Sequence, residues 1–191
     1  LTTLSAALVL AFCAAAWAAS AVWDATQRGS NSAKHLSSLR WHEKAIWFGG
    51  LSGIEVTEDG KGFVAITDRA HLVEGELLRE KGRLTGVQIT RHHRLQDEDG
   101  QPIRETAEDS EGLALAENGA FYISFESPHR VLSYSAQGVR ALPGPKAFGN
   151  FRFNSSFESL ARDASGQLLL ISESPARKSR MSRVWTWTEA S

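Results

Sequence analysis

The sequence is poor in several residues whose chemistry defines common classes of site. Its 191 residues include one cysteine, one methionine and five prolines. The cysteine, Cys13, lies in an apolar N-terminal segment, so the rest of the chain can form no disulfide, no thiolate metal site and no cysteine nucleophile. The formal net charge is only −1, so the chain lacks the bulk field that recruits nucleic acid or an anionic membrane surface.

Motifs for nucleophilic catalysis and for compact metal loops are also missing. Residues 50–54 read Gly-Leu-Ser-Gly-Ile, which lacks the final glycine of the G-x-S-x-G elbow and precedes a predicted strand instead of joining a strand to a helix. Residues 97–100 lack the spacing of an EF-hand loop and are interpreted as a turn. The adjacent His92 and His93 have two interpretations, an exposed polar strand end or a two-histidine contribution to a metal site.

The N-terminal segment differs in composition from the rest of the chain. Residues 4–19 form an apolar, alanine-rich run that ends in small residues, as in the hydrophobic part and cleavage region of a secretory signal peptide. The run is too short to span a bilayer comfortably. We therefore assign residues 1–21 to a signal peptide, 22–44 to a loose lead-in and 45–191 to a folded domain. We expect a periplasmic or secreted bacterial protein that makes no membrane contact after the signal is removed.

One short phrase occurs three times in the chain. The copies read Ser-Gly-Ile, Glu-Gly-Leu and Glu-Ser-Leu, and they start at Ser52, Glu111 and Glu158. Each copy is followed by a turn dipeptide, an apolar run and then an acid, which is Asp68, Glu126 or Glu173. Self-similarity at a spacing of tens of residues indicates a repeated structural unit, with its acids recurring at one level of the architecture.

The spacing of the repeats predicts an all-β fold. The offsets are 59 positions from Ile54 to Leu113 and 47 from Leu113 to Leu160, and four-stranded propeller blades have periods of about 40–50 residues. Turn signals such as Asn118-Gly119 separate the apolar runs. We predict the N-terminal part of a β-propeller built from four-stranded antiparallel blades, with an insertion at residues 91–108. Further blades are expected to be missing at the C-terminus, because three units cannot close a ring.

The acids that open two of the repeats are candidate metal ligands. Inner strands of successive blades face a central channel, so we expect Glu111 and Glu158 to meet there, with Asp109 close to Glu111. Converging carboxylates repel one another unless protons or a cation intervene. Oxygen ligands without thiols favour calcium, so Ca²⁺ is the expected cofactor. The alternative is structural: these side chains accept hydrogen bonds from backbone N–H groups and so hold the blades together. The first copy has Ser52 in place of the acid.

The acids that close the apolar runs are each followed by an arginine. The three arginines are Arg69, directly after Asp68, and Arg130 and Arg177, four positions after Glu126 and Glu173. One interpretation is that the arginines gather on one face and present forked donors to a phosphate or another anionic group of a substrate. The other is that each acid and its arginine form a structural pair that holds a loop in place.

Several of these phrases together resemble a known family. They look like the motifs of the bacterial proteins described as "esterase-like activity of phytase", or phytase-like proteins, and the similarity extends from about Trp47 to Trp187. The phrases that carry the resemblance are residues 49–54, 66–69, 109–114, 124–126 and 157–160. The resemblance implies an exported β-propeller longer than this chain. It places Asp68, Glu111, Glu126, Glu158 and Glu173 at the acidic positions of the family.

The resemblance also implies a function. The expected reaction is hydrolysis of a carboxylic or phosphoric ester assisted by a divalent cation, and the expected partner is a small anionic or ester substrate, not nucleic acid. Two alternatives stay open. One is a non-catalytic, calcium-stabilised propeller that binds a ligand or partner. The other is a sugar-lactone hydrolase, because lactonase propellers also carry a Glu-Gly pair on an inner strand.

Overall fold

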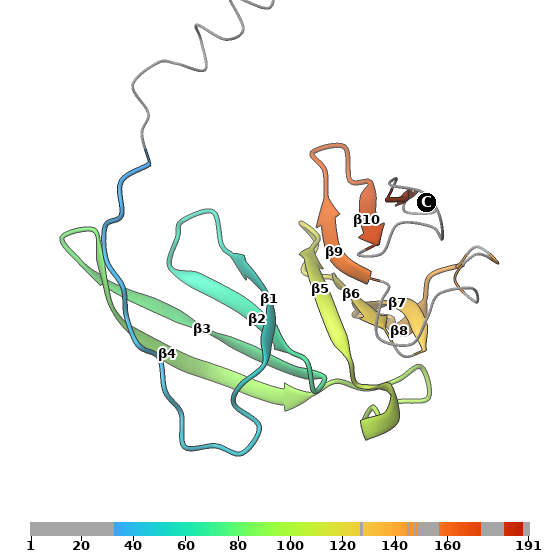
Figure 1. The fold of residues 1–191 in the computed structure, drawn as a ribbon, viewed down its shortest axis with the longest axis horizontal. Helices are drawn as coiled ribbons and strands as arrows, with labels where there is room; N and C mark the ends of the chain where they lie inside the picture. Colours follow the sequence, from blue (N-terminus) through green and yellow to red (C-terminus); the bar gives the residue numbers. More distant parts are fainter. Residues whose placement is uncertain are drawn as a thin grey trace, which may run out of the picture. The chain divides into compact units, whose positions relative to one another are not determined.

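A computed structural model describes residues 33–126, 128–144, 146, 148, 157–172 and 182–188. Residue contacts divide the chain into two units, 1–37 and 38–191, and every described strand belongs to the second unit (Figure 1). Within the described residues, no helix has the length and apolar character that a membrane crossing requires. The signal peptide expected at residues 1–21 lies outside the described residues.

The described strands form three antiparallel sheets, each made of strands that follow one another in the sequence. The first sheet has the order β1-β2-β3-β4, the second β5-β6-β7-β8 and the third β11-β10-β9. Sheets of this kind, with their first strands side by side, are propeller blades. The three sheets do not close a ring in the described part of the chain. The protein is therefore all-β and forms part of a β-propeller, and we refer to the sheets as blades 1, 2 and 3.

The bounds of the elements follow the repeats. Blade 1 contains β1 Leu51–Val56, β2 Gly62–Thr67, β3 His71–Glu80 and β4 Arg83–Arg94. A short 3-10 helix, η1 Glu105–Ala107, precedes blade 2, which contains β5 Ser110–Leu115, β6 Phe121–Glu126, β7 His129–Ser135 and β8 Gly138–Ala141. Blade 3 contains β9 Phe157–Arg162, β10 Leu168–Ser172 and β11 Val184–Trp187.

The three repeat copies occupy equivalent places in the blades, as the spacing predicts. The repeated phrase forms the inner strands β1, β5 and β9, and the apolar run after it forms β2, β6 and β10. The turn between them contains Gly60, Gly119 or Gly166, with φ of 70°, 81° and 88°. Glycine adopts this conformation without steric cost because it has no Cβ. Each repeat is therefore a hairpin that a glycine-containing turn closes.

The offset between the first two repeats, 59 positions against 47 for the next pair, is not explained by the insertion predicted at residues 91–108. The connections after blades 1 and 2 have equal lengths, residues 95–109 and 142–156. The hairpin β3–β4, by contrast, runs from His71 to Arg94, while its counterpart β7–β8 runs only from His129 to Ala141. The extra residues lengthen the outer hairpin of blade 1 (Figure 1). The inner strands with the repeated phrase are left unchanged.

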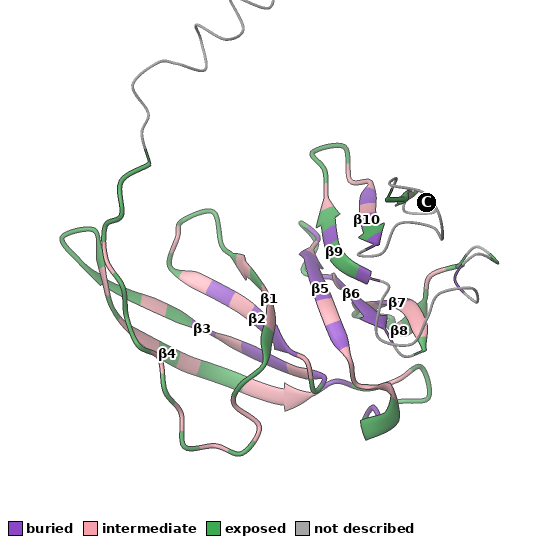
Figure 2. Cartoon of the chain, viewed as in Figure 1, coloured by how far each residue is buried: buried purple, intermediate pink, exposed green. Residues whose placement is uncertain are grey.

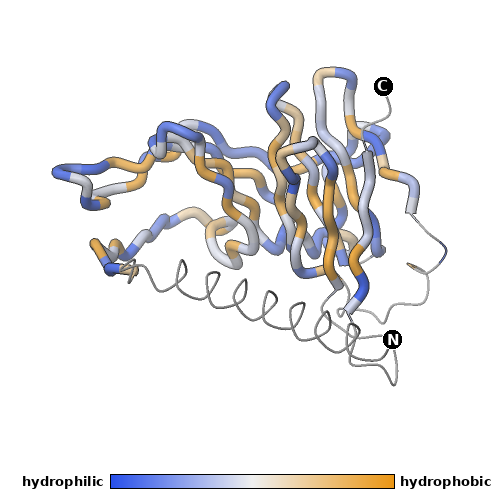
Figure 3. The backbone as a smooth tube through the Cα atoms, turned by 90° about the horizontal axis from the view of Figure 1, so that it is seen from above, coloured by the Kyte–Doolittle hydropathy of each residue, from blue (hydrophilic) through white to orange (hydrophobic). Residues whose placement is uncertain are grey.

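Two hydrophobic cores lie between successive blades. The first joins blades 1 and 2 and includes Ile66 and Leu113, and the second joins blades 2 and 3 and includes Ala114 and Leu170. The neighbours Leu113 and Ala114 belong to different cores because successive side chains of a strand point to opposite faces. Blade 2 is therefore apolar on both faces, and β5 and β6 are largely buried (Figure 2). Figure 3 shows hydrophobic residues recurring along the strands of the folded unit.

The second position of the repeated phrase sets how closely the inner strands approach. β1 lies against β5, and β5 lies against β9. A Cβ added at Gly112 would lie 2.6 Å from the Cβ of Leu160 and 2.9 Å from its backbone nitrogen. At Gly53 the nearest atom of the next blade is the Cβ of Leu113, at 3.1 Å. The glycines of the first two phrases, Gly53 and Gly112, thus make room for the leucine of the next copy.

Residues 41–48 cover the face of blade 1 that points away from blade 2. Phe63, Ala65 and Val73 are buried on this face, and Trp41 and Trp47 pack against them. Trp41, which lies in the range assigned to the lead-in, meets Phe63 edge-on with ring centroids 5.6 Å apart. The folded unit therefore makes use of residues that precede the first blade.

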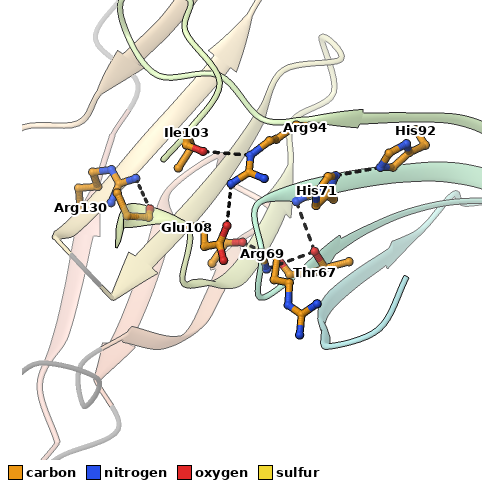
Figure 4. Close-up of polar contacts among 10 residues, drawn as sticks. Thr67, Arg69, His71, His92, Arg94, Ile103, Glu108 and Arg130 are labelled. Atoms are coloured by element: carbon orange, nitrogen blue, oxygen red, sulfur yellow. Dashed lines mark hydrogen bonds and ion pairs between the residues drawn. The ribbon is translucent and has the colours of Figure 1, made fainter. Parts of the chain in front are cut away.

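A short aromatic stack continues this cover over β3 and β4. Trp47 stacks on His92 with ring centroids 3.7 Å apart, and Nε2 of His92 shares a hydrogen bond of 2.9 Å with Nδ1 of His71 (Figure 4). His92 is half-buried and participates in packing, in contrast to the exposed strand end that was one of its two interpretations. The His71–His92 hydrogen bond needs an unprotonated acceptor nitrogen on one ring, so the two rings cannot both be charged while it is kept.

Replacing Gly112 by alanine is expected to destabilise the protein by about 2 kcal/mol, within the range for overpacked cores, because the added methyl group meets the Leu160 backbone. Gly53→Ala is the matched control, since it changes the same repeat position and its nearest neighbours are side-chain atoms that can adjust. Urea unfolding of both variants measures the difference. Equal losses of stability in the two variants would contradict the closer approach of β5 and β9.

The free energy of unfolding is expected to decrease as the pH falls from about 6.5 to about 4. Burial, followed by the positive charges of His92 and Arg94, lowers the pKa of His71 from 6.5 to about 4. In this window the unfolded chain binds a proton that the folded chain does not, so acid favours unfolding. Thermal melts across the window measure the loss, and His71→Gln should reduce it. An undiminished loss in that variant would assign the effect to other groups.

Candidate functional site

Each inner strand has a β-bulge at the same place in the repeat. In blade 2 the pairing register shifts between Ser110 and Gly112, which leaves Glu111 without a partner in the adjacent strand. The shifts in blades 1 and 3 leave out Ser52 and Glu158 in the same way. A bulge frees one residue from the regular alternation and re-aims its side chain, and bulges are frequent beside active sites. The residue that each bulge frees is the first of the repeated phrase.

Three other carboxylates lie within electrostatic reach of Glu111. Burial, followed by the negative charges of Asp109, Glu158 and Glu126 and by a hydrogen bond with the Asp109 carboxyl group, raises the pKa of Glu111 from 4.5 to about 7. Asp109 and Glu111 belong to blade 2 and its entry, Glu126 ends β6, and Glu158 comes from blade 3. The structure thus brings two of the predicted ligands, Asp109 and Glu158, within electrostatic reach of the third, Glu111. We call these three residues and Glu126 the acidic cluster.

Glu126 is the buried member of the acidic cluster, with 3% of its surface exposed. Its Oε1 accepts a hydrogen bond of 3.1 Å from the backbone N–H of Phe157, the residue before Glu158. Its own backbone N–H donates to the carbonyl of Asp109 at 2.8 Å. Glu126 therefore connects the two chain segments that contain Asp109 and Glu158. Sequence reasoning identified it as a motif acid but gave no sign of these contacts.

Blades 1 and 2 are joined at the same level by hydroxyl groups. The Ser52 hydroxyl donates to the carbonyl of Ser110, and the Ser110 hydroxyl donates to the carbonyl of Thr67, both at 2.6 Å. Asp68, the counterpart of Glu126, lies over Gly50, and among the described residues its buried Oδ1 has no hydrogen-bond partner. Because Ser52 replaces the acid here, the carboxylates gather between blades 2 and 3.

Arg130 is held by backbone carbonyls. Its two terminal nitrogens donate to the carbonyls of Pro128 at 2.9 Å and Ala107 at 2.8 Å, and its guanidinium carbon lies 4.1 Å from the centre of the Phe125 ring. Burial lowers the pKa of Arg130, although nearby groups including Glu98 oppose the change. Arg130 thus fastens the start of β7 to the segment before β5. Its binding of a substrate stays a prediction.

The other predicted residues differ in what the structure says about them. Arg69 is exposed in the turn after β2, and its backbone N–H donates to the Thr67 hydroxyl (Figure 4). Sequence reasoning did not identify Arg94, which donates to the Ile103 carbonyl and pairs with Glu108 at 2.7 Å. The available sequence signal for such a pair was the run of acids at residues 105, 108, 109 and 111. Glu173 and Arg177 lie outside the described residues.

The donor chemistry of the acidic cluster suits a hard cation. Its ligands would be carboxylate oxygens, which Ca²⁺ prefers. Among the described residues, no three His, Asp or Glu side chains are already arranged to hold a metal ion. Glu158 is exposed and Glu111 is half-buried. The cluster therefore suits a cation in its donor chemistry, and binding one would require these side chains to change position.

Comparison with known families identifies the chain. Residues 46–191 match the phytase-like family, which is described as "Esterase-like activity of phytase". The chain belongs to this family. The matched region includes all three blades of this phytase-like protein and every residue of its acidic cluster. Among curated proteins, none shows a significant match.

Solved structures of several differently named proteins are similar to this chain. Virginiamycin B lyase from Staphylococcus aureus is 10% identical, with 73% of this chain and 41% of that chain covered and a TM-score of 0.40. A structure of U3-55K is 16% identical, with 73% and 39% covered and a TM-score of 0.42. The β-propeller domain of Cps50 (Swd1) from Myceliophteria thermophila is 13% identical, with 64% and 34% covered and a TM-score of 0.37. The phytase-like chain thus spans less than half the length of these structures.

The charge on Glu111 is expected to reduce stability above neutral pH. With a pKa of about 7 in the folded protein against 4.5 ordinarily, Glu111 keeps a proton on folding that the unfolded chain has lost between these values. The stability that this proton contributes is complete below the unfolded-state pKa of 4.5 and is lost as the pH rises through the folded-state pKa of about 7. Glu111→Gln should therefore melt at a higher temperature than wild type at about pH 8, with little difference at about pH 5. A variant no more stable than wild type at the higher pH would contradict the crowding of charge at this site.

Proposed function

We propose that the protein is an exported hydrolase of carboxylic or phosphoric esters that uses Ca²⁺ held by Glu111, Glu158 and Asp109. The observation that carries the proposal is that Glu111 and Glu158 lie at the bulges of two successive blades, with the charges of Glu158 and Asp109 both acting on Glu111. The description of the family, which names esterase activity and phytase, supports the reaction class. The apolar composition of residues 4–19 supports export to the periplasm or the medium.

The residues would have the following roles in such a reaction. A bound cation would polarise a substrate oxygen and lower the pKa of a bound water. Glu111 and Glu158 approach from different blades, so they would hold the ion between them, while Asp109 shares a hydrogen bond with Glu111 on the blade 2 side. Arg69 is exposed, whereas two nitrogens of Arg130 already donate to carbonyls. Of these two, Arg69 is therefore the better candidate to orient an anionic group, and Arg177 is the third predicted arginine.

A second candidate function is a non-catalytic propeller that Ca²⁺ stabilises and that binds a ligand or partner. Two contacts favour it, because Glu126 and Arg130, both predicted as site residues, make hydrogen bonds to the backbone. In this case the carboxylates would join blades 2 and 3, and Ca²⁺ would relieve their repulsion. Ca²⁺ would then raise the melting temperature without any turnover.

Turnover of an aryl ester or a phosphomonoester is expected to require both Ca²⁺ and Glu111. Glu111→Gln should lower kcat/KM by roughly 100-fold, the loss typical of removing one electrostatic group from an active site. Glu117→Gln is the matched control, since its side chain lies on the turn after β5 with 91% of its surface exposed. The assays use this chain and a full-length family member, with and without a chelator. Turnover that survives both the chelator and the Glu111 substitution would refute the proposal.

A further inference from the structure

The residue immediately before each acidic bulge is held by the preceding blade. Ser110, which precedes Glu111, is fully buried, and its hydroxyl donates to the Thr67 carbonyl of blade 1 at 2.6 Å. Phe157, which precedes Glu158, is also fully buried. Because phenylalanine has no hydroxyl group, blade 3 cannot repeat the serine contact. The backbone N–H of Phe157 instead donates to Oε1 of Glu126 in blade 2, at 3.1 Å.

Phe157 is held through both its side chain and its backbone. Its ring packs edge-on against Phe148 and Trp185, with ring centroids 4.6 Å and 6.1 Å apart. Its backbone N–H is held by Glu126. Glu158 follows at the bulge, where strand pairing does not fix it. Phe157 also pairs with Ser172 in β10, and its ring meets His129 of blade 2 edge-on with centroids 5.9 Å apart. The hydrogen bond to Glu126 joins the backbone just before Glu158 to the blade of Glu111.

A carboxylate is a costly group to place at this position. Glu126 is buried, and its negative charge contributes to the raised pKa of Glu111. A buried charge is tolerated when strong hydrogen bonds satisfy it, and bonds to an ionised acceptor are stronger than neutral ones. The hydrogen bond to Phe157 is one such contact, and a nearby cation would relieve the repulsion with Glu111.

We propose that Glu126 is the positioning residue of the candidate cation site, because its carboxylate holds the Phe157 N–H and thereby fixes Glu158 opposite Glu111. The role of Glu158 as a ligand rests on the proposed function. The contact between Glu126 and Phe157 does not, so the two can be tested separately.

Two substitutions of similar length separate the hydrogen bond from the charge. Glu126→Gln and Glu126→Met both remove the negative charge, but only glutamine keeps an oxygen that can accept the Phe157 N–H. Ca²⁺ binding is measured by calorimetry, and hydrogen exchange of the Phe157 and Glu158 amides is measured by NMR. Loss of the charge should weaken Ca²⁺ binding in both variants. The methionine variant should bind Ca²⁺ roughly fivefold more weakly still, the equivalent of one typical hydrogen bond, and only its Phe157 amide should exchange faster.

Tyr134→Phe controls for general loss of stability. It removes a 3.0 Å hydrogen bond from the Tyr134 hydroxyl to the Gln96 carbonyl, in the core between blades 1 and 2. This variant should lose stability and bind Ca²⁺ like wild type. Equal Ca²⁺ affinities of the glutamine and methionine variants, or unchanged exchange at Phe157 in the latter, would overturn the positioning role. Absence of Ca²⁺ binding by wild type would refute the proposed function instead, and the exchange measurement would still decide the contact.

Discussion

The close approach of consecutive inner strands governs both the fold and the candidate site. Leu113 and Leu160 pack where Gly53 and Gly112 of the preceding copy have no side chain, so β1, β5 and β9 lie next to one another. Each of these strands begins with a bulge, and adjacent strands bring the residues freed by their bulges close together. Wherever two successive copies begin with an acid, like charges must meet. Burial, followed by the charges of Asp109 and then Glu158, raises the pKa of Glu111, so this packing contributes to the shift.

The repeats made much of this arrangement predictable from the sequence. Equivalent positions in repeated units occupy equivalent places, so the copies that start at Ser52, Glu111 and Glu158 became the three inner strands. The glycine-containing turns and the apolar runs gave β2, β6 and β10 for the same reason. Proximity of the two glutamates followed from the shared axis of propeller blades. These inferences needed only the spacing of the repeats and the local residue pattern, which the sequence contains directly.

Features that depend on pairing between distant residues could not be read in this way. A repeat offset gives the number of extra residues but not their place, so the lengthened β3–β4 hairpin was assigned to the wrong segment. The bulge at Glu111 depends on the register between β5 and β6, which the hydrophobic pattern does not specify at one end of a strand. The hydrogen bond of Glu126 with Phe157 joins residues 31 positions apart, and no local signal marks it.

The acids of the cluster differ in a way that separates structural from functional roles. Glu126 is buried and its carboxylate accepts a backbone N–H, as expected of a group that holds blades together. Glu111 instead is half-buried among three other carboxylates, and folding makes its ionisation less favourable. A group that contributes only to stability would not need a charge that weakens the fold above neutral pH, whereas active sites commonly retain such groups at a cost in stability. This contrast favours a cation or substrate at Glu111 over a purely structural function of the whole cluster.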